Sequence, residues 1–246
     1  MQIDGKKQLF KKLIAISIFI IALLIVGIMM LKYEVEGEKN MPYKLTKISV
    51  VSNVTGTHNE NSDEFWNLSL VQNNDIYLNF EKNLNSSNEA LIKKVILDNI
   101  KVEKEPAIGL IKFYKTSNNI SNTYQNSVED LIQDRIEYIG SMQSNLEQQE
   151  IANNGGFAGI RATTENIGNH ASNNTEIRID GALLKGMNIT NEELNAEISF
   201  DVILELTSGI KYKAKVKVEV PCGNIVEEGM CKKEINSTDD IIFKRF

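Results

Sequence analysis

The stretch that decides the fold is residues 196–220, AEISFDVILELTSGIKYKAKVKVEV. Its even-numbered residues are apolar on both sides of Thr207-Ser208-Gly209, and its odd-numbered residues are mostly polar. An alternation with a period of two is typical of strands with one buried face. A two-residue turn would place lysines opposite leucines, so parity favours a three-residue turn. We therefore predict an antiparallel hairpin with Gly209 in the left-handed conformation, forming a G1 bulge.

The solvent face of this hairpin carries four lysines in a row, Lys211, Lys213, Lys215 and Lys217. In the predicted register Glu205 faces Lys211 and Asp201 faces Lys215. Facing opposite charges stabilise a strand pair by roughly 0.2–1 kcal/mol. We interpret the row as a neutralised, solvated strand face rather than as a site for polyanions.

Shorter alternating segments predict further strands outside the hairpin. Residues 43–51 predict a first strand, and residues 66–70 and 76–80 predict a second hairpin with an odd-length loop at Asn73 or Asn74. More strands are expected near residues 95–104, 107–115, 157–163, 176–184 and 240–246.

Two helix signals interrupt the strands. Apolar residues spaced by three and four predict an amphipathic helix over residues 128–139, ending before Gly140. Thr190-Asn-Glu-Glu193 is a capping-box sequence, although only about one helical turn can follow it. Many short strands and few helices predict a mainly β domain, either one β-sandwich or two stacked ones, with one or two short helices. A subdivision is expected, if anywhere, near residues 116–150.

The N-terminal part predicts a membrane anchor. Residues 13–31 are nineteen uncharged, mostly apolar residues without proline, which is long enough for a transmembrane helix. Residues 1–12 form a basic leader, and residues 32–42 form a stalk of mixed charge. The positive-inside rule then places the N-terminus in the cytoplasm and residues 43–246 outside, as a single-pass protein of the plasma membrane. The alternative is a cleaved signal peptide, whose apolar core of about 7–15 residues is shorter than this one.

The charge distribution narrows the range of ligands. The chain carries a formal net charge of −6, and residues 1–12 carry +3, which leaves −9 for the rest. An acidic external domain argues against nucleic acid and against anionic lipid as its ligand.

Few residues suggest chemistry. Cys222 and Cys231 are the only cysteines, and either a disulfide or two unpaired thiols is consistent with their spacing, which fits no redox or zinc motif. His58 and His170 are the only histidines and are expected in separate polar loops, without ligand spacing. The acidic loop 59–64 lacks the spacing of a calcium loop. We therefore expect no catalytic, metal-binding or cofactor-binding residue, and no cofactor.

The whole layout resembles uncharacterised single-pass proteins of low-GC Gram-positive bacteria. The resemblance is carried by the Lys-rich leader, the single span, the C-terminal DIIFKRF and three segments: MPYKLTKISVVSN, WNLSLVQNNDIYLNFEKN and ISFDVILELTSGIKYKAKVKVEVP. It implies a bacterial plasma-membrane address and no catalytic activity.

Three functions follow as expectations. The first is a non-catalytic interaction or assembly module that binds a protein partner in the cell envelope. The second is a ligand sensor or solute-binding protein, and the third is an extracytoplasmic hydrolase. An uncovered edge strand or an apolar patch would favour the first function. Acidic residues or histidines that converge in one pocket would favour the other two.

Overall fold

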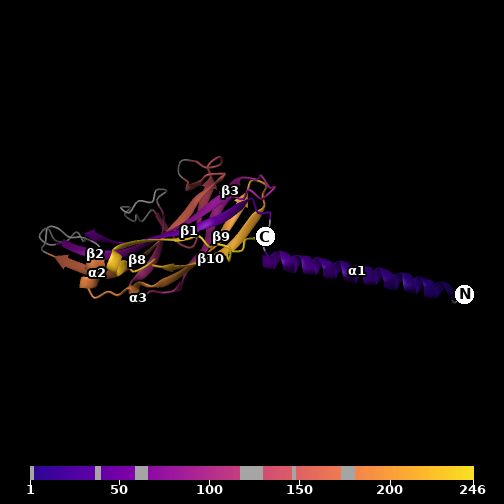
Figure 1. Ribbon diagram of the computed structural model, residues 1–246, viewed down its shortest axis with the longest axis horizontal. Helices are drawn as coiled ribbons and strands as arrows, with labels where there is room; N and C mark the ends of the chain where they lie inside the picture. Colours follow the sequence, from indigo (N-terminus) through magenta and orange to yellow (C-terminus); the bar gives the residue numbers. More distant parts are fainter. Residues whose placement is uncertain (1–2, 37–39, 59–65, 117–129, 146–147, 173–180) are drawn as a thin grey trace.

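A computed structural model describes residues 3–36, 40–58, 66–116, 130–145, 148–172 and 181–246. Helix α1 (Ile3–Glu36) projects from one end of an elongated β body (Figure 1). We call this end of the body the proximal end and the opposite end, beside α2, the distal end. The C-terminus lies near the proximal end.

The described residues of the body form two six-stranded sheets, as expected for a mainly β fold. Sheet A has the order β11 (Met230–Ile235), β1 (Tyr43–His58), β2 (Trp66–Lys82), β8 (Gly155–Ser172), β4 (Leu110–Lys115) and β5 (Leu131–Ile132). Sheet B has the order β12 (Lys244–Arg245), β10 (Lys211–Val220), β9 (Ala196–Leu206), β3 (Ile92–Lys104), β6 (Ile136–Gly140) and β7 (Glu150–Ile151). All described pairs are antiparallel except β6 with β7.

The two sheets share one hydrophobic core over the proximal half of sheet A. Buried residues of β1, β2 and β8 pack there against the inner face of sheet B, which makes a β-sandwich. Beyond sheet B, the distal half of sheet A is covered by three short helices, α2 (Gly181–Gly186), α3 (Asn191–Leu194) and α4 (Ile225–Glu228). A second, smaller core lies under these helices, so the body is one sandwich with a helix-covered extension.

A buried polar layer separates the two cores on the inner face of sheet A. Gln72 and Asn74 bond each other through both side-chain amides, at 2.6 and 2.9 Å. Ser52 donates to the Asn74 Oδ1 atom at 2.7 Å and accepts from the Cys222 amide at 2.9 Å. Because the partners satisfy one another, the polar side chains are accommodated without a break in the strands.

The hairpin at residues 196–220 is confirmed. Lys211 pairs with Glu205 and Lys215 with Asp201, as predicted. The Leu206 amide bonds the Ile210 carbonyl at 2.9 Å, and Gly209 has φ +84°, so three residues make the turn. The even-numbered side chains are buried from Tyr212 to Val220. The capping box at Thr190 is confirmed too, with one turn of helix after it.

The second predicted hairpin is wrong. Residues 66–82 form one continuous strand, β2, which pairs with β1 and β8 along its length. Asn73 and Asn74, expected in a loop, are buried within it. The polar run does not break the strand, because neighbouring strands supply polar partners, such as Thr163 for Asn73.

The amphipathic helix over residues 128–139 is also wrong. From residue 131 this segment forms β5 and β6, and residues 128 and 129 lie outside the described residues. Ile136 and Tyr138 alternate toward the core, so a period of two prevails in the segment. Of the strand expected at 176–184, residues 181–184 belong to helix α2, and the rest is not described. The other predicted strands are present.

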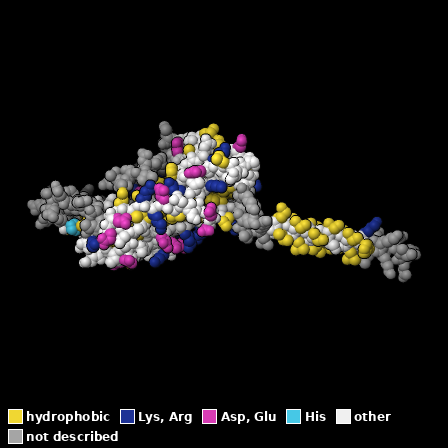
Figure 2. All heavy atoms as spheres, in the orientation of Figure 1, with side chains coloured by type: hydrophobic (Ala, Val, Ile, Leu, Met, Phe, Trp, Pro, Cys, Tyr) yellow, Lys and Arg dark blue, Asp and Glu magenta, His cyan; other side chains and the backbone are white. Residues whose placement is uncertain are grey.

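Helix α1 contains the one candidate membrane span among the described residues, Phe10–Met30. Its apolar side chains are exposed, and Figure 2 shows them as a continuous hydrophobic surface outside the body. The helix is long and apolar enough to cross a bilayer.

Candidate interaction surface

The open edge of β10 is the clearest candidate for a functional surface. Among the described residues, β12 pairs with β10 only at Tyr212 and Lys213, and no strand pairs with β10 farther along this side. Because even-numbered residues bond β9, the amides and carbonyls of odd-numbered residues point toward the open edge. The Phe246 amide accordingly donates to the Lys211 carbonyl at 3.2 Å. The same backbone groups of Lys215, Lys217 and Glu219 have no backbone partner among the described residues.

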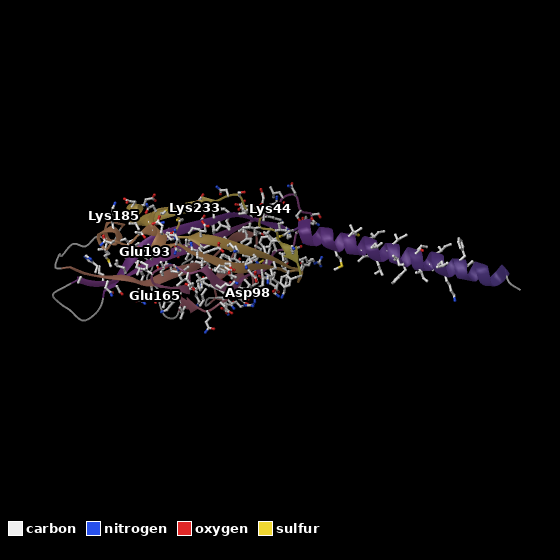
Figure 3. All side chains as sticks on the ribbon, turned by 90° about the horizontal axis from the view of Figure 1, so that it is seen from below. Lys44, Asp98, Glu165, Lys185, Glu193 and Lys233 are labelled. Atoms are coloured by element: carbon white, nitrogen blue, oxygen red, sulfur yellow. The ribbon has the colours of Figure 1, made fainter. Side chains whose placement is uncertain are left out.

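A groove runs beside this edge, between β10 of sheet B and β11 of sheet A. Its volume is about 280 Å³, and it is lined by apolar residues and by charged ones: Val50, Val218, Ile235, Glu197, Lys217, Glu219 and Lys233. Lys217 bonds Glu197 at 2.8 Å. Figure 3 shows Lys233 at the edge of the body, between Lys44 near α1 and Lys185 at the distal end.

The exposed face of β10 carries little uncompensated charge. Lys213 bonds Asp201 at 2.8 Å, and Lys215 bonds Glu103 at 3.1 Å. Hydrogen bonds from Ser199, Lys215 and Lys101 lower the pKa of Glu103 to about 2. The lysine row is therefore neutralised, as the sequence predicts.

The two cysteines lie where the chain leaves β10 and crosses to sheet A. Both are free thiols in the structure. The buried Cys222 Sγ donates to the Cys231 carbonyl at 3.2 Å and to the Val50 carbonyl at 3.3 Å. Burial, a hydrogen bond with Cys222 and the nearby Glu228 raise the pKa of the Cys231 thiol to about 12. The structure thus brings the two residues together, and the disulfide stays a prediction.

The histidines do not lie in loops as expected. His58 ends β1, and His170 lies within β8. Both pair with Leu68 of β2, so the two backbones flank the same residue from opposite sides. The side chains of residues 57–67, among them Trp66 and the acidic loop 59–64, lie outside the described residues.

A buried ion pair that the sequence did not predict lies on the outer face of sheet A. The Arg161 guanidinium donates to both carboxylate oxygens of Asp75, at 2.6 and 2.7 Å. Arg161 is 1% exposed and Asp75 is 4% exposed. Burial raises the pKa of the adjacent Tyr77, and the Asp75 charge raises it further. Asp75 stands in the polar run that we expected to be a loop, and this placement concealed the pair.

These residues do not form a recognisable chemical site. Among the described residues, no group of three or more histidine, cysteine, aspartate and glutamate side chains could hold a metal ion. The charges of Arg161 and Asp75 compensate each other in a bidentate contact, as in a structural ion pair. No protein-family model, no curated protein and no solved structure matches this chain.

Proposed function

We propose that the protein is a non-catalytic interaction module, anchored in the plasma membrane by α1, whose external β-sandwich binds a protein partner along the open edge of β10. The N-terminus is cytoplasmic in this proposal, and the sandwich lies outside. The basic leader and the apolar span Phe10–Met30 support the anchor and its orientation.

The observation that carries the proposal is the edge of β10 from Ala214 to Val220, with which no other strand of the described residues pairs. An exposed edge presents a row of unpaired backbone groups to which another chain can add a strand. The partner is therefore an extended segment. Its side chains toward the groove beside the edge would be polar or charged, because Val50 and Val218 are buried and the accessible lining is mostly charged: Glu197, Lys217, Glu219 and Lys233. No specific observation favours the ligand-sensor or hydrolase alternatives.

The test blocks the edge without altering the fold. Lys217→Pro removes an amide that points away from β9, and proline is tolerated on an edge strand at such a position. Lys217→Ala is the matched control, because it removes the same ion pair with Glu197 but keeps the amide. A photo-crosslinking residue at position 233 then reports occupancy of the groove in intact cells of the native host.

We expect a crosslinked product with the native chain and with Lys217→Ala, and its loss with Lys217→Pro. Circular dichroism and melting of the purified variants establish that both remain folded. Unchanged crosslinking in a folded Lys217→Pro variant would contradict strand addition at β10.

A further inference from the structure

Three strongly exposed apolar side chains lie at the proximal end of the body. Leu84, Met142 and Phe246 are the three most exposed large hydrophobic residues of the described body, at 90%, 74% and 65%. They belong to three segments that are distant in sequence. Single exposed apolar residues are common, but three at one end of a domain mark an interaction surface when they lie together.

The loop that holds Leu84 is fastened to the point where the chain arrives from α1. The Asn83 side chain donates to the Met41 carbonyl at 2.9 Å, and its amide donates to the Pro42 carbonyl at 2.7 Å. The Ser86 hydroxyl donates to the Asn40 carbonyl at 2.8 Å. Leu84 is therefore held beside the first described residues after the anchor.

Met142 is held at the same end by a buried asparagine. The Met142 amide donates to the Asn153 Oδ1 atom at 2.7 Å. The carbonyl of Asn153 accepts from the Tyr43 hydroxyl at 2.8 Å, and Tyr43 begins β1. The loop after β6 is thus attached to the proximal start of sheet A.

Phe246 is held at the proximal end as well. Its amide donates to the Lys211 carbonyl. Lys211 follows Ile210 and the three-residue turn, at the proximal end of the hairpin. Phe243, three residues earlier, packs edge-on against Phe80 near the end of β2, with ring centroids 6.5 Å apart. The C-terminal segment is therefore anchored to the core while the Phe246 ring remains exposed.

The connection to the membrane span is short. From Met30 to Glu36 the helix rises about 9 Å, and the four residues to Asn40 reach about 14 Å at most. The proximal end accordingly cannot lie more than about 23 Å from the end of the apolar span.

We propose that the proximal end of the sandwich rests on the bilayer in which α1 is anchored, with Leu84, Met142 and Phe246 inserted at the lipid interface. This proposal rests on the membrane anchor proposed above, but not on the edge of β10. Apolar side chains that enter the boundary between headgroups and acyl chains stabilise such a contact in proportion to the area they bury. The contact is apolar rather than electrostatic, which agrees with an acidic external domain and predicts that uncharged lipids suffice.

The experiment uses the full chain, reconstituted in phosphatidylcholine vesicles with or without bromine on the acyl chains, which quenches nearby tryptophan. Leu84→Trp is the probe. Leu110→Trp is the matched control, because Leu110 is 64% exposed but stands at the start of β4, paired with Glu165 away from the proximal end. Phe19→Trp, within α1, reports insertion of the anchor. The native Trp66 signal is subtracted.

We expect brominated lipid to reduce the added fluorescence of Phe19→Trp strongly and that of Leu84→Trp about twofold, and to leave Leu110→Trp unchanged. Phe246→Trp should be quenched as well, and less so when Leu84→Asp is combined with it. This double variant tests whether the introduced tryptophan alone drives insertion.

Quenching of Phe19→Trp without quenching of Leu84→Trp would overturn this proposal and leave the anchor intact. Equal quenching of Leu84→Trp and Leu110→Trp would overturn it too, since the contact would not be confined to the proximal end. Absence of quenching in Phe19→Trp would instead show that the proposed anchor fails, and the bilayer contact with it.

Discussion

At the scale of single residues, Asn153 organises the proximal end of the body. It is buried, and its side chain bonds the Ile92 carbonyl at 2.7 Å, the Gln143 side chain at 2.9 Å and the Ser141 hydroxyl at 2.8 Å. One side chain thus connects β3 with the loop after β6. Gly140 is required beside it, because a Cβ atom there would lie 2.4 Å from the Asn153 Nδ2 atom.

Asn153→Ala should therefore lower the free energy of unfolding by roughly 2–4 kcal/mol, because several buried partners lose their hydrogen bonds together. Urea denaturation followed by circular dichroism measures the effect. Asn154→Ala is the control, since Asn154 is the exposed neighbour, and it should change stability by less than about 0.5 kcal/mol. Similar values for the two variants would contradict the role of Asn153.

The thiols allow a second test at this scale. The raised pKa of Cys231 makes its thiolate scarce near neutral pH, so iodoacetamide should modify the folded chain slowly and the unfolded chain rapidly at pH 8. Glu228→Gln should speed the modification of Cys231, because removal of the nearby negative charge lowers that pKa. Glu227→Gln is the neighbouring control, since Glu227 bonds Lys185 instead.

Mass spectrometry of the modified peptides gives both rates. Equal acceleration by the two variants would indicate local opening of α4 rather than an electrostatic effect. Mild oxidation of the native chain should join Cys222 to Cys231, and mass spectrometry without reduction would detect the bond.

At the scale of elements, the sequence predicts the strands whose two faces differ in polarity. The 196–220 hairpin has one apolar, buried face and one mostly polar face that is half-buried or exposed along β10, so its period, register and turn all follow from parity. β2 has polar residues buried on both faces, such as Asn74 inside and Asp75 outside, and its sequence therefore reads as a loop. The partners that satisfy them, Ser52 and Arg161, are distant in sequence, so no local pattern can reveal them.

Only the part of the candidate surface that depends on local alternation could be predicted from the sequence. The solvated lysines of β10 follow from alternation alone. The open edge depends on where β12 stops pairing and where β11 joins β1, which are properties of the assembled sheets. The prediction of a helix over 128–139 is wrong because, in so short a segment, apolar residues spaced by three and four cannot be told from an alternation like that of Ile136 and Tyr138.

Ion pairs on the face of β9 and β10 predict how stability depends on pH. A hydrogen bond from Lys93 lowers the pKa of Glu205, and hydrogen bonds, from Ser199 above all, lower the pKa of Glu103 to about 2. Near pH 4 the unfolded chain therefore binds more protons at these carboxylates than the folded chain does. Stability contributed by them is present above the unfolded pKa values and is lost as pH falls from about 4.5 toward 2.

The melting temperature should accordingly fall over this range, and less steeply in Glu205→Gln than in the native chain. Glu219→Gln is the control, because Glu219 lies on the same strand pair but faces Glu197 rather than a lysine. An acid limb as steep in Glu205→Gln as in Glu219→Gln would contradict the assignment.

At the scale of the whole molecule, the body is polarised along its length. The proximal end carries the exposed Leu84, Met142 and Phe246 and the connection to α1, whereas the distal end is closed by α2, α3 and α4 over the second core. The open edge of β10 runs between them along one side. This arrangement leaves the proposed edge accessible to a protein partner while the proximal end occupies the membrane, so the two proposed contacts do not compete.

The orientation of the chain in the membrane can be tested by labelling introduced cysteines. Lys6, Lys7, Lys11 and Lys12 precede the apolar span, whereas the flank after it carries both signs, so the N-terminus should stay in the cytoplasm. In a background with Cys222→Ser and Cys231→Ser, an impermeant maleimide should label Glu36→Cys in intact cells and Asp4→Cys only after lysis. Labelling of Asp4→Cys alone in intact cells would reverse the orientation. Release of a labelled chain that lacks residues 1–31 would instead establish the cleaved signal peptide, and the external sandwich would then lose its anchor.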